Sequence, residues 1–273
     1  MFFIIFFIIL FLFFLFFGLN NFCSYFASFL TYKVILFFLK VILSIIFSWI
    51  FIFFIFLFCV FIMKKLEPNH PFKKKVLSSI SELIIKFFRI QIKVYNKHYI
   101  PDKGQLVIYS NHKSFFDPFI LAYFFPRTIT FSPKNSLYNG FLGIFLGFCF
   151  NSLDCMQIVR GDNRETFINI MKTIDKIKKN FLSIVIFHEG GRKNKKNDKI
   201  IDSLEGSFKI ALKSESAILP VSIKGSSDMI GKCWFRKKKI EVFVHPCIDF
   251  EDYKEQKTQK INERVNKIIN SVL

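Results

Sequence analysis

The first 63 residues constrain this chain most, because they carry almost no charge. They contain no Asp or Glu, and their basic residues are Lys33 and Lys40. Met1–Phe17 is a nearly unbroken run of Phe, Ile and Leu, and Val34–Met63 is a second apolar stretch in which Val41–Ile62 gives 22 uncharged residues. About 20 apolar residues suffice for a helix to cross a bilayer. We therefore expect residues 1–63 to form about two membrane-embedded helices.

The sequence leaves open whether these helices span the bilayer or dip into one leaflet. A cleaved signal peptide fits poorly, because no basic segment and no clear small-x-small cleavage site are present. The orientation is predicted by the lysines that come next, which are Lys64, Lys65, Lys73, Lys74 and Lys75. Positively charged flanks stay on the cytoplasmic side. We therefore expect an integral or monotopic membrane protein whose domain after residue 63 lies in the cytoplasm.

The rest of the chain is strongly basic. Residues 64–273 carry 37 basic and 20 acidic side chains, a net charge of +17. Two kinds of partner attract such a domain: anionic lipid headgroups, with about 1 kcal/mol per Lys or Arg near the surface, or nucleic acid. The adjacent membrane segment favours membrane lipids and argues against nucleic acid. Six scattered cysteines form no CxxC pair and have no His at ligand spacing, so we expect no disulfide framework and no metal site. No cofactor is expected either.

Short apolar runs alternate with helical patterns after residue 90, which predicts an α/β fold with a mostly parallel sheet flanked by helices. We expect a basic linker and an amphipathic helix over residues 64–90, and the α/β domain over residues 91–273. The apolar face of residues 76–90 either rests on the bilayer or packs on the domain core. Seven runs predict strands: Gln91–Tyr95, Gln105–Tyr109, Thr128–Phe131, Met156–Val159, Ser183–Phe187, Ile218–Ile223 and Ile240–Val244.

Two helices are also predicted in this domain. Asp162 with Glu165 forms a capping box, and an apolar stripe from Phe167 to Ile177 follows it. The last helix is expected over about Glu255–Val272.

Polar clusters follow three of the predicted strands. Ser110–Asp117 follows the second strand, Arg160–Arg164 the fourth and His188–Arg192 the fifth. In open α/β sheets ligands bind beyond the carboxyl ends of the strands. The three clusters should therefore converge on one site.

The side chains of these clusters have a coherent chemistry. His112 is suited to act as a general base, because imidazole ionises close to neutral pH. Asp117 lies five residues on, where its carboxylate can fold back and hold one imidazole nitrogen, as the acid of a serine triad does. Arg160, Arg164 and Arg192 supply planar forks of donors for a phosphate. Taken singly each has an ordinary structural explanation, and only the order and spacing of the clusters favour a catalytic site.

Residues 91–250 resemble the glycerolipid acyltransferase superfamily of the lysophosphatidate acyltransferase (PlsC-like) type. Asn111–Pro118 resembles its first block, Asn-His-x-Ser-x-x-Asp. Ile158–Glu165 resembles the second, Phe187–Arg192 the third (Phe-Pro-Glu-Gly-Thr-Arg) and Ile218–Ile223 the fourth. In the third block a His replaces the usual Pro and a Gly replaces the usual Thr, which bears on the choice of acceptor.

The resemblance implies direct acyl transfer without an acyl-enzyme. His112, held by Asp117, takes the proton of the acceptor hydroxyl, and the alkoxide attacks a thioester on acyl-CoA or acyl carrier protein. The acceptor is a lysophospholipid, expected to be lysophosphatidic acid, which becomes phosphatidic acid in phospholipid biosynthesis. The substrate-binding residues that the resemblance implies are Asn111, Ser114, Arg160, Glu189, Gly190 and Arg192, with Arg160 and Arg192 on the acceptor phosphate and Glu189 ordering its loop.

Two other functions stay open at this point. One is an acyltransferase of the same family with a different lysolipid or an aminolipid as acceptor. The other is a non-catalytic, membrane-tethered basic module that binds anionic lipid or nucleic acid, for which the spacing of His112 and Asp117 would be accidental.

Overall fold

The structure is a computed structural model that describes residues 2–18, 30–159, 163–180, 182–192, 197–229 and 236–273. The chain divides into two compact units, Met1–Ile62 and Met63–Leu273.

The first unit is helical. Helix α1 (Phe2–Phe13) runs into a π-helical turn, η1 (Phe14–Gly18), and α2 (Leu30–Lys65) comes next, with its last residues, from Met63 on, belonging to the second unit. Aromatic contacts join the two helices: the rings of Phe7 and Trp49 have centroids 5.2 Å apart. Within the described residues one helix, Val34–Lys65, is long and apolar enough to cross a membrane. The 12 residues of α1 fall short of the about 20 that a spanning helix needs.

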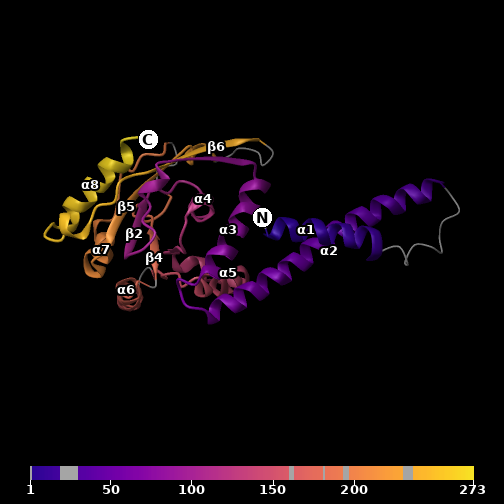
Figure 1. The fold of residues 1–273 in the computed structure, drawn as a ribbon, viewed down its shortest axis with the longest axis horizontal. Helices are drawn as coiled ribbons and strands as arrows, with labels where there is room; N and C mark the ends of the chain where they lie inside the picture. Colours follow the sequence, from indigo (N-terminus) through magenta and orange to yellow (C-terminus); the bar gives the residue numbers. More distant parts are fainter. Residues whose placement is uncertain (1, 19–29, 160–162, 181, 193–196, 230–235) are drawn as a thin grey trace. The chain divides into compact units, whose positions relative to one another are not determined.

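The second unit is built on a six-stranded sheet with the order β1-β6-β5-β2-β4-β3. β5 and β6 pair antiparallel, and the other neighbours pair parallel, which confirms the predicted mostly parallel sheet. Figure 1 shows β5, β2 and β4 side by side in this unit, with β6 along its upper edge. Their bounds are β1 Ile90–Tyr95, β2 Leu106–Ser110, β3 Thr130–Phe131, β4 Ser183–Ile186, β5 Ala217–Lys224 and β6 Lys238–Val244.

Helices cover both faces of this sheet (Figure 1). On one face α3 (Pro71–Phe87) and α4 (Asp117–Phe124) share a buried apolar cluster with the strands. On the other, α6 (Asn163–Lys178), α7 (Lys209–Ser214) and α8 (Thr258–Asn270) share a second cluster. Of the two placements open for residues 76–90, the structure shows packing on the core, with Val76, Leu77 and Ile85 buried. A further helix, α5 (Gly140–Ser152), precedes β4.

The prediction of a strand over Met156–Val159 is wrong. This segment runs beside residues 131–135 and makes only an isolated parallel bridge, between Ile158 and Lys134. The N–H of Ile158 donates to the carbonyl of Pro133 over 3.1 Å, but Pro133 has no N–H to continue the ladder. Val159 then turns away, because both its N–H and its carbonyl bond the Thr166 hydroxyl. Asp162 of the predicted capping box lies outside the described residues.

Candidate active site

The imidazole of His112 lies just beyond the carboxyl end of β2. Its Nδ1 is 2.9 Å from Oδ2 of Asp117, the first residue of α4. The ring stacks on Phe187, with centroids 4.2 Å apart and planes 19° apart, and 18% of the side chain is exposed. The other nitrogen, Nε2, has no hydrogen-bond partner among the residues that the structure describes. The ring is thus held on one edge and open on the other.

The carboxylate of Asp117 is fully buried. Besides the imidazole, its Oδ2 accepts the backbone N–H groups of Lys113 and Ser114, each over 2.8 Å. Its Oδ1 accepts the hydroxyl of Ser226. Four donors therefore offset the cost of burying this charge, and they fix the carboxylate so that it favours the His112 tautomer with a proton on Nδ1.

Glu189 connects the loop after β4 to the loop that carries His112. Its Oε1 accepts the backbone N–H of His112 over 2.8 Å, and its Oε2 forms a buried ion pair with Lys113. Burial raises the pKa of the Glu189 carboxyl, and the Lys113 ammonium opposes that shift. With both side chains enclosed by protein, Glu189 is placed to order the two loops.

The side chains of Asn111 and Ser114 are also turned into the protein. Asn111 is fully buried, and its amide both donates to and accepts from the backbone of Ile223 over 2.8 Å, which joins β2 to β5. The Ser114 hydroxyl accepts the N–H of Phe116 over 3.3 Å. These contacts support the shape of the site, and the predicted substrate contacts of both residues stay a prediction.

The three arginines of the sequence clusters differ in what the structure shows of them. The guanidinium carbon of Arg192 lies 3.3 Å from the ring centroid of Phe115, which belongs to the first block. Arg164 is exposed in the first turn of α6, and Arg160 lies outside the described residues. The structure therefore brings together the first and third clusters, and it shows only the end of the second.

Gly190 is required where it stands. Its φ is +68°, a conformation that side chains rarely adopt, and an added Cβ would lie 2.6 Å from a methyl carbon of Leu204. Leu204 is itself tied to this loop, since its N–H donates to the carbonyl of His188 over 2.7 Å. The glycine thus permits the tight turn that presents Arg192.

The sequence did not predict four residues that support the site: Lys113, Phe187, Ser226 and Asp198. Lys113 and Phe187 stand inside the recognised blocks, but the sequence does not show that Lys113 is buried or that Phe187 stacks on the His112 ring. Ser226 follows β5, and Asp198 shapes its loop by accepting the N–H groups of Gly225 and Ser227, each over 2.7 Å. A polar residue beyond the end of a strand was the available signal for Ser226, because β5 ends two residues earlier.

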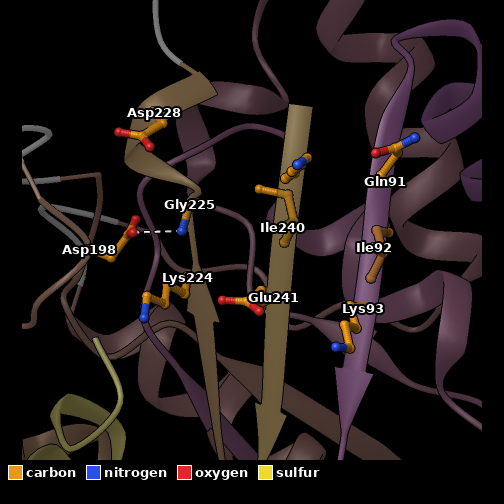
Figure 2. Close-up of a pocket in the computed structure, with 10 residues that line it drawn as sticks. Gln91, Ile92, Lys93, Asp198, Lys224, Gly225, Asp228, Ile240 and Glu241 are labelled. Carbon is orange, nitrogen blue, oxygen red and sulfur yellow. Dashed lines mark hydrogen bonds between the residues drawn. The ribbon is translucent and has the colours of Figure 1, made fainter. Parts of the chain in front are cut away.

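A pocket of about 600 Å³ lies beside this region, across β1, β6 and the end of β5 (Figure 2). Its lining carries charges of both signs, among them Lys93, Lys224 and Glu241. Neither His112 nor Asp117 lines it. Figure 2 shows the Asp198–Gly225 hydrogen bond in its wall, at the start of the loop that carries Ser226.

Comparison with known proteins relates this arrangement to acyl transfer. Residues 91–224 match the family model described as Acyltransferase. A probable 1-acyl-sn-glycerol-3-phosphate acyltransferase of Mycoplasma genitalium is 32% identical over 208 residues, covering 72% of this chain and 73% of the relative. The 1-acyl-sn-glycerol-3-phosphate acyltransferase of Borreliella burgdorferi is 29% identical over 190 residues, covering 67% and 73%.

A solved structure shares the fold. The crystal structure of PlsC, the 1-acyl-sn-glycerophosphate (LPA) acyltransferase of Thermotoga maritima, matches with a TM-score of 0.59 at 20% identity. The match covers 73% of this chain and 78% of that one.

Proposed function

The chain belongs to the family of 1-acyl-sn-glycerol-3-phosphate acyltransferases, and from that membership we propose that it acylates the free hydroxyl of lysophosphatidic acid to give phosphatidic acid. One observation carries the proposal for the site. His112 is held on one edge by the buried carboxylate of Asp117 and is open at Nε2. This is the arrangement that a general base for a hydroxyl requires.

The proposed reaction needs no nucleophile from the protein. His112 Nε2 takes the proton of the acceptor hydroxyl, and Asp117 stabilises the imidazolium that forms. The oxygen attacks the carbonyl carbon of the acyl thioester, so that a C–O bond forms and the C–S bond breaks. The departing thiolate takes the proton back from His112. General-base catalysis of this kind contributes about 10²–10⁴-fold.

We propose Arg192 as a residue that holds the acceptor phosphate, together with Arg160. The face of the Arg192 guanidinium covers the ring of Phe115. Stacking of this kind uses the face of the cation and leaves the N–H donors in its plane. None of these donors bonds a described residue, and a phosphate takes such a fork in pairs. Acyl-CoA or acyl carrier protein is the proposed donor.

Membrane lipids are the proposed surroundings of both acceptor and product. Helix α2 supplies an apolar segment of spanning length, and Lys64 and Lys65 in its last turn favour a cytoplasmic position for the domain on their C-terminal side. We propose that residues 64–90 lead into a catalytic domain over residues 91–273 on that side.

The assay that tests this function uses membranes from cells that express the chain. Lysophosphatidic acid and a labelled acyl donor, offered in one arm as acyl-CoA and in another as acyl carrier protein, should give labelled phosphatidic acid. His112→Ala should lower turnover by at least about 10²-fold. The matched control is His98→Ala, because His98 is exposed in η2 (Lys97–Tyr99) and away from the Asp117 carboxylate.

Either of two results would change the proposal. Near-normal turnover of His112→Ala would remove the assigned base. If label enters another lysolipid and not lysophosphatidic acid, the proposed reaction stands and that lysolipid is the acceptor.

A further inference from the structure

Helix α5 exposes large apolar side chains on the second unit. Its 13 residues contain no charged side chain. The exposed fractions of Phe141, Leu142 and Ile144 are 89%, 72% and 74%. Single exposed apolar residues are ordinary in folded proteins, but three adjoining ones of this size mark an interaction surface.

The outward placement of these side chains follows from two glycines. Gly143 and Gly147 lie one helical turn apart and both are buried. A Cβ at Gly143 would come within 2.4 Å of the carbonyl carbon of Tyr138, and one at Gly147 within 3.0 Å of the Tyr138 ring. The small residues thus face the protein and the large ones face out, which is the reverse of a helix that packs its apolar stripe on a core.

A contact between α5 and Lys64 within the second unit indicates what covers α5. Lys64, in the last turn of α2, has its Nζ 5.9 Å from the ring centroid of Phe148 in α5. Lysines at the end of a spanning helix lie at the level of the lipid headgroups. A helix in contact with Lys64 is therefore at the boundary between headgroups and hydrocarbon.

We propose that the first turns of α5 insert into the bilayer interface as a second membrane contact of this protein. Thirteen residues make a helix of about 20 Å, which is too short to cross the hydrocarbon core. An apolar helix of this length instead lies in the interface, with its large side chains among the acyl chains. The partner is a lipid surface, and the contact does not depend on the acyltransferase activity.

The test places a fluorescent side chain on this surface in the full chain. Phe141→Trp is made in a background in which Trp49 and Trp234 are replaced by Phe, and the protein is reconstituted into vesicles of phosphatidylcholine and phosphatidylglycerol. Lipids brominated at the headgroup end of their acyl chains should quench its emission, and aqueous iodide should not. Tyr99→Trp in the same background is the control, because Tyr99 is 38% exposed in η2 and should show the opposite pattern.

Two outcomes would overturn the proposal. Quenching of the Phe141→Trp variant by iodide and not by brominated lipid would place α5 in water. If neither quencher reduces the emission, and this protection is lost as the protein is diluted into more lipid, a second copy of the chain covers α5. Ile144→Trp gives an independent reading, should the substitution at residue 141 disturb the helix.

Discussion

Ser226 shows how a residue outside the recognised blocks enters the site. Its hydroxyl donates to Oδ1 of Asp117 across 109 positions of sequence. The contact of His112 with Asp117 could be predicted, because five residues of loop and helix start bring them together. The Ser226 contact could not, since it depends on β5 lying next to β2 in the sheet.

Replacing Ser226 by Ala should weaken the support of Asp117. A hydrogen bond to a buried charged group contributes about 1.5–3 kcal/mol, so we expect a loss of that order in the free energy of unfolding and a fall in kcat. Ser227→Ala is the matched control, because no described residue bonds the Ser227 hydroxyl. Denaturant unfolding in detergent and initial rates measure both effects, and equal results for the two variants would show that Ser226 only fills space.

Replacing Arg192 by Lys keeps the charge and removes the planar fork. The apparent KM for lysophosphatidic acid should rise about tenfold, the equivalent of roughly one lost net hydrogen bond to a charged group, with the KM for the donor little changed. Arg264→Lys on the exposed side of α8 is the control. A rise in the donor KM alone would mean that Arg192 serves the phosphates of the donor.

Among the elements, α8 holds the loop that carries the third block. His188 Nε2 lies 2.7 Å from Oδ1 of Asn266. The amide of Asn270 bonds both backbone groups of Ile200 over 2.9 Å, and Asn266 also donates to the hydroxyl of Ser203. The His188 ring is buried against Tyr109 and Phe208, and its Nδ1 is buried with no partner among the described residues. The histidine that replaces the usual Pro thus ties two elements together.

His188 should make stability fall in mild acid. Burial lowers the pKa of His188 to about 4, from the ordinary histidine value of 6.5. Between these pH values His188 binds a proton in the unfolded chain and does not bind one in the folded chain. The free energy of unfolding should therefore drop by about 3 kcal/mol as pH falls from 6.5 to 4, and His188→Gln should lose this part of the drop.

Unfolding of both proteins across that pH range, in the same detergent, measures the difference. His98→Gln is the control and should keep the full drop, because His98 is exposed. His245 is present in all three proteins and cancels in the comparison. Parallel curves for the parent and His188→Gln would show that His188 is protonated in the fold.

At the level of elements, six of the seven predicted strands are present in the sheet, because β-branched and apolar runs mark buried strands well. It failed at Met156–Val159, where the composition is that of a strand. Whether a strand forms there depends on the pairing partner, because the neighbouring Pro133 has no backbone N–H to donate to a ladder hydrogen bond. Pairing partners lie far apart in sequence, so local pattern does not reveal them.

For the molecule as a whole, the side of the membrane is the property to test first. The Lys64, Lys65 and Lys73–Lys75 cluster predicts a cytoplasmic domain. A Cys placed at the exposed Lys199 should not react with a small, membrane-impermeant thiol reagent in intact cells, and it should react after lysis. The parent chain, with its own cysteines, gives the background. Labelling of Lys199→Cys above that background before lysis would reverse the orientation.

The hydrogen bonds from α8 to the loop after β4 can form only late in the synthesis of the chain. Asn266 and Asn270 are synthesised 63–78 residues after the loop residues that they bond. At about 5–20 residues per second, that interval is roughly 3–16 s. During it the apolar N-terminal segment has already left the ribosome, while the loop after β4 still lacks its anchor. Nascent chains should therefore expose the apolar segment of α2 to a membrane before the hydrogen bonds from α8 hold the loop after β4.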